Sequence, residues 1–117
     1  MFNLKKIANN INQVVNDFLN KVKILLEERL KKVILYGSYA RGDYNNLSDI
    51  DIMILTDFSD AEIEEYRDKI SDIAFNLELD TGYIISPIIR NIDTFKVRTN
   101  YIPFYYNVEK EGVVLVG

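Results

Sequence analysis

The chain has 117 residues and a mass of 13.6 kDa, which leaves room for one domain. It contains no cysteine and no histidine, so disulfides, thiolate or imidazole metal sites and histidine acid–base catalysis are excluded. Its net charge of −4 argues against direct nucleic-acid binding, and the lack of a long apolar run argues against a membrane protein. We expect one cytoplasmic domain over residues 1–117.

The first predicted element is a long amphipathic helix from about residue 3 to residue 29. Its apolar side chains recur at spacings of three and four, which is the period of one helix face. They are Leu4, Ile7, Ile11, Val14, Phe18, Val22 and Leu25. This helix would occupy residues 1–30, and a sheet core with C-terminal helices would occupy residues 31–117.

Two strands and a second helix follow. The apolar run Lys32–Tyr36, closed by Gly37, predicts a buried strand, and the alternation over Asp49–Leu55 predicts another. A polar segment joins the two strands. Ser59 and Glu62 have the spacing of a capping box and predict the start of a helix that runs to about residue 78.

The C-terminal part of the chain predicts one more strand and short helices. After the break at Gly82, Tyr83–Ile89 is expected to be a strand, and Pro87 indicates an edge position or a bulge. Thr94–Arg98 and Phe104–Lys110 are short helical candidates, and Val113–Val116 is expected to be extended. The predicted class is therefore α/β (α+β): a small mixed sheet with helices packed on one side.

Asp49 and Asp51 are the first candidate site residues. Because strand side chains alternate between faces, residues two apart point the same way. Two carboxylates held this close repel each other unless a cation lies between them. Oxygen donors suit a hard divalent ion, and Mg²⁺ takes one or two carboxylates together with substrate phosphates.

Gly37 and Ser38 follow the first predicted strand and form the second candidate feature. A glycine at this point lets the backbone turn sharply and approach a ligand closely. The amides and the Ser38 hydroxyl could then donate to phosphate oxygens. Arg41, three residues on, offers a planar fork to a phosphate. A phosphate cradle that faces a carboxylate pair predicts a metal–nucleotide site.

The combination of these motifs resembles one family. Gly37-Ser38, ten intervening residues and Asp49-x-Asp51 are similar to the signature of the DNA polymerase β-type nucleotidyltransferase superfamily. The segments Tyr36-Gly-Ser-Tyr-Ala-Arg-Gly42 and Ser48-Asp-Ile-Asp-Ile52 resemble in particular its minimal nucleotidyltransferases, known as MNT proteins. The specific match covers residues 33–55, and the length and element order of the whole chain also suit the family.

The resemblance implies an enzyme and its partners. An acceptor hydroxyl attacks the α-phosphorus of ATP, Mg²⁺ assists, and pyrophosphate leaves. Asp49 and Asp51 would be the catalytic metal ligands, Gly37 and Ser38 would hold the β- and γ-phosphates, and Arg41 would be an auxiliary phosphate contact. The resemblance also implies an antitoxin that adds AMP to a tyrosine of a HEPN-domain ribonuclease toxin, so the nucleotide and this toxin are the expected partners.

A third carboxylate ligand is the point at which this sequence departs from the family pattern. Many members carry that acid on the strand predicted here over Tyr83–Ile89, which has none. If that strand began early, Asp80 would share a face with Ser86 and could serve as a metal ligand. Glu78 is the other nearby acid. Ser86 could take the ligand's position, and Asp80 could equally be a helix-terminal or turn residue.

Several alternatives stay open from sequence. The chain could be a non-catalytic nucleotide-binding module that neutralises its partner by contact, or a subunit of an aminoglycoside-type nucleotidyltransferase. The acceptor, the nucleotide preference and any homo- or hetero-oligomer are not determined. Aromatic residues near the C-terminus could pack over the sheet, stack on a base or contact a partner; they are Tyr101, Phe104, Tyr105 and Tyr106. Tyr39 and Tyr44 flank the proposed cradle.

Overall fold

The structure is a computed structural model that describes residues 9–117. Its elements in chain order are η2 (Asn9–Ile11), α1 (Asn12–Leu26), η3 (Glu27–Arg29), β1 (Leu30–Tyr36), α2 (Ser38–Arg41), β2 (Ile50–Thr56), α3 (Asp60–Thr81), β3 (Ile85–Asn91), α4 (Ile92–Arg98), α5 (Pro103–Glu111) and β4 (Val113–Val116). The part of the predicted first helix over residues 3–8 lies outside the described residues. The remainder is α1, flanked by two 3₁₀ turns. None of the helices within residues 9–117 is long and apolar enough to cross a bilayer.

The four strands form one mixed sheet in the order β3-β2-β1-β4. β1 pairs antiparallel with β2 and with β4, whereas β2 and β3 are parallel. The prediction of a mixed sheet is confirmed, and so is the edge position of Pro87, because β3 is an outer strand. A proline is tolerated there because its missing amide hydrogen is not needed for pairing on the outer side.

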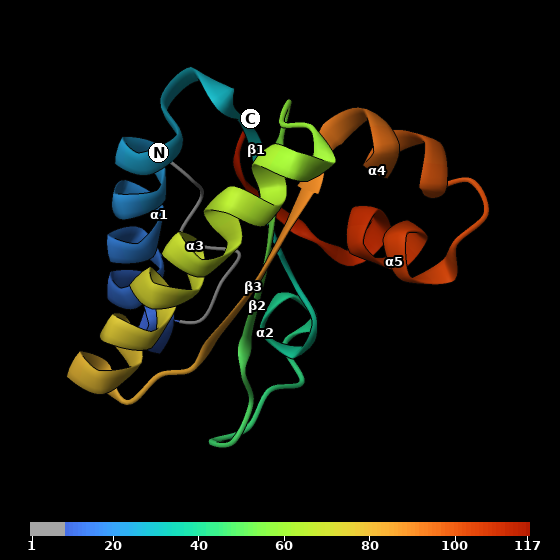
Figure 1. The fold of residues 1–117 in the computed structure, drawn as a ribbon. Helices are drawn as coiled ribbons and strands as arrows, with labels where there is room; N and C mark the ends of the chain where they lie inside the picture. Colours follow the sequence, from blue (N-terminus) through green and yellow to red (C-terminus); the bar gives the residue numbers. More distant parts are fainter. Residues whose placement is uncertain (1–8) are drawn as a thin grey trace.

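α1 and α3 cover one face of the sheet (Figure 1). Their apolar stripes pack on the strand residues that alternate toward them, which include Val33, Leu35 and Ile52. The deepest side chains of this cluster include Phe18 and Leu19 of α1 and Ile70 of α3. Burial of these stripes is the main term that holds the helices on the sheet.

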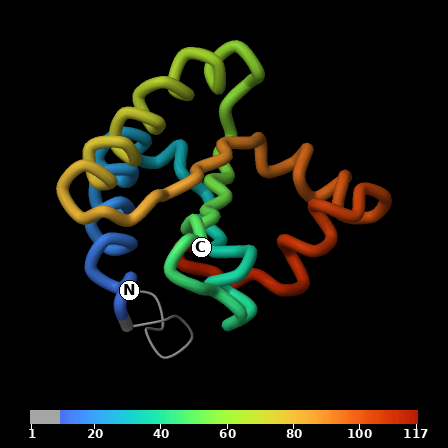
Figure 2. Tube along the Cα trace, turned by 90° about the horizontal axis from the view of Figure 1, so that it is seen from below, coloured from blue at the N-terminus to red at the C-terminus, as the bar shows by residue number. Residues whose placement is uncertain are grey.

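α4 and α5 cover the opposite face, so the expectation of helices on one side only is wrong. Ile34 and Met53 of the sheet pack there against Phe95, Tyr105 and Val108. Figure 2, seen from below, shows the same division, with α4 and α5 across the strands from α1 and α3. The physical reason lies in β1 and β2. Their consecutive apolar residues leave no polar face, so both faces of the two central strands must be covered.

The ends of two strands bring the predicted site residues together. In the antiparallel pair of β1 and β2, Tyr36 is the register partner of Asp51. The polypeptide leaves β1 at Gly37, forms the single helical turn α2, and returns to β2 through a loop. The last residues of β1 and the first residues of β2 therefore lie at the same end of the sheet.

Candidate functional site

An open cleft of about 560 Å³ lies at this end of the sheet, between α2 and α5. It is lined by Tyr36, Gly37, Ser38, Arg41, Asp51, Phe104, Asn107, Val108 and Glu111. Four of the predicted site residues, namely Gly37, Ser38, Arg41 and Asp51, therefore share one cavity. β1 and α2 supply the first three, and β2 supplies the carboxylate.

Gly37 makes the closest approach in the cleft. Its backbone angles are φ 75° and ψ −155°, a combination that is essentially restricted to glycine. A Cβ atom built on this residue would lie 2.3 Å from Oδ2 of Asp51. The absence of a side chain is therefore what allows the Asp51 carboxylate to abut the turn.

α2 begins directly after Gly37 and presents the beginning of a helical turn to the cleft. The amides of Ala40 and Arg41 donate to the Gly37 carbonyl at 3.1 and 3.0 Å. The amides at the start of a helical turn have no acceptor within it, so they are available to an anion. Ser38 is partly buried and lines the cleft with its hydroxyl-bearing side chain.

Arg41 ends α2 and is engaged by two carboxylates. Its Nε donates to Oδ2 of Asp43 at 3.1 Å, and one terminal nitrogen lies 3.5 Å from Oε2 of Glu111 on α5. The hydrogen bond with Asp43, with a smaller contribution from Glu111, raises the pKa of the Arg41 guanidinium. Arg41 is thus a fully charged cation in the wall of the cleft.

Asp51 and Asp49 differ in their surroundings. Asp51 is partly buried, and this burial, followed by the charge of Asp49, raises the pKa of its carboxyl group, while Arg41 acts in the opposite direction. Asp49 is exposed just before β2, and its Oδ2 accepts a hydrogen bond from the Ser86 hydroxyl at 3.0 Å. Ser86 is also the register partner of Asp51 in β3.

The oxygen donors of this end of the sheet fit a hard divalent cation. Burial and a neighbouring like charge both disfavour ionised Asp51, and a cation between the carboxylates would relieve both effects. Residues 9–117 contain no cluster of three or more carboxylates that could hold a metal by themselves. Asp49 and Asp51 alone would leave most of the coordination shell of such a cation to water or to a ligand.

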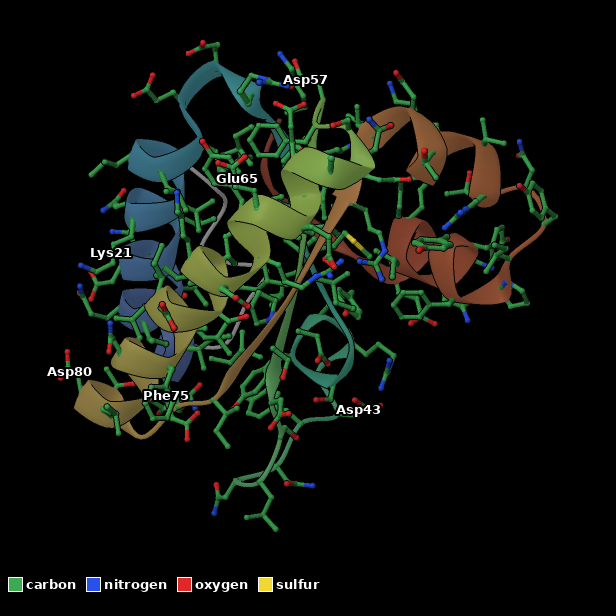
Figure 3. The ribbon with its side chains drawn as sticks, viewed as in Figure 1. Lys21, Asp43, Asp57, Glu65, Phe75 and Asp80 are labelled. Carbon is green, nitrogen blue, oxygen red and sulfur yellow. The ribbon has the colours of Figure 1, made fainter. Side chains whose placement is uncertain are left out.

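The strand β3 does not begin early, which is the condition under which Asp80 was expected to serve as a metal ligand. α3 continues to Thr81 and is capped by Gly82, whose φ is 80° and whose amide donates to the Glu78 carbonyl. β3 begins only at Ile85, so Asp80 is not part of a strand. It is exposed at the far end of α3, and Figure 3 shows it well away from Asp43 at the cleft side. The hydroxyl of Ser86 lies at the carboxylate pair instead.

α5 supplies cleft residues that the sequence did not reveal as site residues. Phe104, Asn107, Val108 and Glu111 line the cleft, and their spacing of three, four and seven places them on one helix face. Tyr36 packs edge-on against Phe104, with ring centroids 5.7 Å apart. Burial, and then the charge of Asp51, raises the pKa of Tyr36 to about 12, so its hydroxyl stays protonated.

The aromatic residues singled out from sequence have different positions. Tyr105 is buried in the second core, where its ring meets Phe95 edge-on. Tyr101 and Tyr106 are exposed. Tyr39 is buried and stacks on Tyr44, with ring centroids 4.5 Å apart. Of the C-terminal aromatics, Phe104 is thus the one that reaches the cleft.

Comparison with known proteins places these features in context. The sequence profile of the nucleotidyltransferase domain matches residues 14–115. "Putative protein adenylyltransferase MJ0604" of Methanocaldococcus jannaschii is 38% identical over 106 residues, which cover 91% of this chain and 98% of the relative. "Putative protein adenylyltransferase MJ0141" of the same organism is 38% identical over 101 residues, covering 86% and 94%. A crystal structure of a mutant toxin–antitoxin pair, MntA–HpeT, aligns with 18% identity and a TM-score of 0.49, covering 94% of this chain and 74% of the other.

Proposed function

The chain belongs to the nucleotidyltransferase domain family, a family of enzymes, and on this premise we propose that it transfers AMP from ATP to a hydroxyl group of another protein. The observation that carries the proposal is the approach of the Asp51 carboxylate to Gly37, where a Cβ atom would lie 2.3 Å from Oδ2. This approach sets a carboxylate beside a glycine–serine turn in one cleft. The two relatives are both named "putative protein adenylyltransferase", and these names support a protein as acceptor.

In this proposal the triphosphate lies on the turn after β1. Gly37 exposes its backbone, and Ser38 provides an amide and a hydroxyl as donors to the β- and γ-phosphate oxygens. Arg41 lines the same cleft and would add a charged, planar donor. These residues hold the β- and γ-phosphates, so the α-phosphorus can lie near the carboxylates of Asp49 and Asp51 at the start of β2.

Asp49 and Asp51 would hold Mg²⁺ beside the phosphates. When bound, the cation supplies charge stabilisation for the phosphoryl oxygens and lowers the pKa of the acceptor hydroxyl. Burial, and then the charge of Asp49, raises the pKa of Asp51, and a bound cation would offset both effects. The hydrogen bond from Ser86 orients Asp49 for the same purpose.

The reaction is a displacement at the α-phosphorus. The acceptor oxygen forms a bond to phosphorus, the bond from phosphorus to the α,β-bridging oxygen breaks, and pyrophosphate leaves with the electron pair. The hydroxyl proton passes to solvent or to a carboxylate of the site. Protein residues accelerate this step by holding the acceptor hydroxyl and the nucleotide in line and by restricting their translation and rotation.

The acceptor that we propose is a tyrosine of a HEPN-domain toxin, and the chain would then act as an antitoxin. The support is the family resemblance of residues 33–55 together with the names of the relatives.

A second candidate function is neutralisation of the partner by contact alone. One observation favours it: residues 9–117 contain no third carboxylate at the metal site, and Ser86 lies beside the pair instead. A hydroxyl is a weaker base and ligand than a carboxylate, so transfer would be slow or absent. Binding of nucleotide could persist without chemistry.

One experiment separates the two candidates. The purified chain, MgCl₂ and α-labelled ATP are mixed with the purified protein encoded by the neighbouring gene, and label on that protein is measured. We expect label on the partner, loss of label with Asp51→Asn, and AMP on a tyrosine by mass spectrometry. Asp80→Asn is the matched control and should leave transfer intact, since Asp80 lies on the far end of α3.

The remaining outcomes decide against enzymatic transfer. Inhibition of the partner that survives Asp51→Asn, without label on the partner, would support the contact mechanism. Loss of the fold in Asp51→Asn, measured by circular dichroism, would assign this residue a structural role.

A further inference from the structure

Among residues 9–117, Arg41 is the only arginine or lysine that lines the cleft, and it is already paired with protein carboxylates. Asp43 accepts from Nε at 3.1 Å, and Glu111 lies 3.5 Å from a terminal nitrogen. The two acids come from different directions. Asp43 belongs to the loop directly after α2, whereas Glu111 is the last residue of α5 on the opposite wall.

The ion pair between Arg41 and Glu111 bridges the cleft in which we place the triphosphate. Both residues line this cleft together with Gly37 and Ser38. A phosphate chain seated on the turn would therefore meet a cation that is already paired and a carboxylate of its own sign. The phosphate chain must either replace Glu111 as the partner of Arg41 or bind without a contact to Arg41.

The pair is weak enough to be displaced. Arg41 and Glu111 have side-chain exposures of 44% and 40%, and exposed ion pairs contribute little to stability. A phosphate group carries more charge than one carboxylate and can accept two parallel bonds from a guanidinium. The phosphates can therefore displace Glu111 from Arg41, but breaking this ion pair lowers the affinity of the protein for the nucleotide.

Glu111 also occupies an unfavourable place in its own helix. The C-terminal end of a helix carries a partial negative charge, and an acid there is disfavoured unless a cation offsets it. α5 ends at Glu111, and the neighbouring cation in the cleft is Arg41. The charge of Glu111 is therefore not needed to stabilise α5.

We propose that Glu111 is an affinity-lowering residue that competes with the phosphates of the nucleotide for Arg41. In the nucleotide-free protein, Glu111 holds Arg41 across the cleft; in the bound state, the β- and γ-phosphates take its place. This inference rests on the proposed function, because it assumes that a triphosphate binds at the Gly37–Ser38 turn.

The test measures the affinity of the full chain for a non-hydrolysable ATP analogue with MgCl₂ by isothermal titration calorimetry. We expect Glu111→Gln to bind the analogue about two- to tenfold more tightly, from the loss of one exposed pair and one repulsive charge. Glu109→Gln is the matched control. It removes the same charge from the same helix, but Glu109 lines a different cavity, so its affinity should equal that of the wild type.

Two further arms tie the effect to Arg41 and to the phosphates. In an Arg41→Gln background, Glu111→Gln should change affinity less than it does alone, because the competition has been removed. AMP, which lacks the β- and γ-phosphates, should bind the wild type and Glu111→Gln almost equally. Thermal unfolding of each variant confirms that the fold is kept.

Three results would overturn the inference. If Glu111→Gln binds more weakly, then Glu111 positions Arg41 for the phosphate and does not compete with it. If its affinity is unchanged while the wild type binds Mg–ATP analogue, the ion pair has no effect on the site. If the wild-type chain binds no nucleotide, the proposed function is wrong as well. The first two results leave the proposed function intact, so the two kinds of failure can be told apart.

Discussion

Gly37 is the residue at which backbone geometry and site chemistry depend on each other most directly. Its backbone angles exclude other residues, and the space that a Cβ would need is filled by the Asp51 carboxylate. Gly42, at the other end of α2, has a φ of 89° but open space around it. A side chain at Gly42 would therefore meet backbone strain alone, whereas a side chain at Gly37 would meet both strain and a steric collision.

We predict that Gly37→Ala destabilises the protein by about 2–4 kcal/mol, which combines backbone strain with overpacking, and abolishes nucleotide binding. Gly42→Ala meets only the strain of the left-handed region and should cost about 1 kcal/mol. Urea unfolding followed by circular dichroism gives both values. Equal losses for the two variants would contradict the collision with Asp51.

Asp51 gives a pH-dependent prediction. Its raised carboxyl pKa means that the folded protein disfavours the ionised form, so the free energy of unfolding decreases as pH rises from the ordinary carboxyl pKa through the raised value. In metal-free buffer with EDTA, Asp51→Asn should raise the melting temperature at neutral pH by a few degrees, roughly the effect of 0.5–1 kcal/mol. This gain should shrink as the pH falls below the raised carboxyl pKa, because Asp51 in the wild type then becomes protonated.

Asp57→Asn is the control of opposite sign. The hydrogen bond from Arg29 is the largest contribution that lowers the pKa of Asp57, so its stabilisation is present at neutral pH and is lost as the pH falls. Asp57→Asn should therefore lower the melting temperature at neutral pH. If Asp51→Asn also lowered it, Asp51 would be a structural residue.

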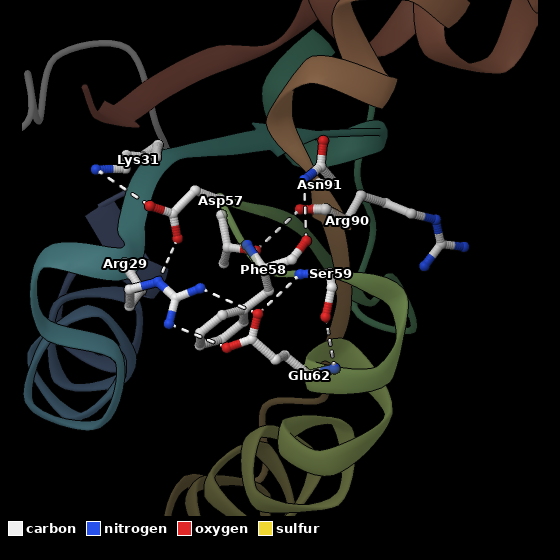
Figure 4. A network of polar contacts seen from close by, with 9 residues as sticks. Arg29, Lys31, Asp57, Phe58, Ser59, Glu62, Arg90 and Asn91 are labelled. Carbon is white, nitrogen blue, oxygen red and sulfur yellow. Dashed lines mark hydrogen bonds and ion pairs between the residues drawn. The ribbon is translucent and has the colours of Figure 1, made fainter.

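At the scale of elements, the ends of three segments are joined by one polar network (Figure 4). Arg29 of η3 bonds both carboxylate oxygens of Glu62 in the first turn of α3, at 3.0 and 3.1 Å, and it also bonds Asp57 after β2. Its guanidinium lies 4.5 Å from the centroid of the Phe58 ring. These contacts fix the angle at which α3 leaves the sheet.

Ser59 caps α3 within this network. Its hydroxyl accepts from the Glu62 amide at 3.3 Å, and the Glu62 carboxylate accepts from the Ser59 amide at 3.1 Å. We predict that Ser59→Ala costs about 1 kcal/mol and lowers the melting temperature by roughly 3–6 °C. Ser71→Ala, in the exposed middle of α3, should cause no loss because alanine is the better helix former; an equal loss there would contradict the capping role.

At the scale of the whole molecule, β1 and β2 share their side chains between two cores. Val33 and Leu35 pack on the face of α1 and α3, whereas Ile34 between them packs on the face of α4 and α5. Loss of either helical layer would expose apolar residues of the same two strands. The two layers are therefore coupled through the sheet, and α5 is held in place as one wall of the cleft.

We predict that the chain unfolds in one cooperative transition. Phe95→Ala should move the whole transition to a lower urea concentration. Phe95 is 4% exposed in the second core, so its removal should cost about 3–5 kcal/mol. Far-ultraviolet circular dichroism and tyrosine fluorescence should give one midpoint in urea. Phe75→Ala is the matched control, because Phe75 is 56% exposed on α3. Separate midpoints for the two probes would show that α4 and α5 unfold independently.

Local patterns were sufficient to predict most elements and half of the candidate site. Apolar periodicity reports which side of a helix or strand is buried, so α3, the strands and the C-terminal end of α1 were predicted to within a few residues. Gly37, Ser38, Asp49 and Asp51 could be selected because their spacing is a local property of a strand, a turn and a second strand. The consecutive apolar residues of β1 also contained the signal for a sheet covered on both faces, which the one-sided expectation overlooked.

Tertiary structure alone decided the remaining features. Glu111 and Asn107 lie more than fifty residues after Asp51, and nothing local indicates that α5 packs on the face toward which Asp51 points. Asp80 does not share a strand face with Ser86, because α3 runs to a glycine cap before β3 begins, and the length of a helix depends on the packing that stabilises its last turn. Sequence thus determined which candidate site residues lie at the strand ends and turns, since those positions follow from neighbours along the chain. The packing of α5 determined which charges face them, because that depends on the distribution of apolar surface over the whole sheet.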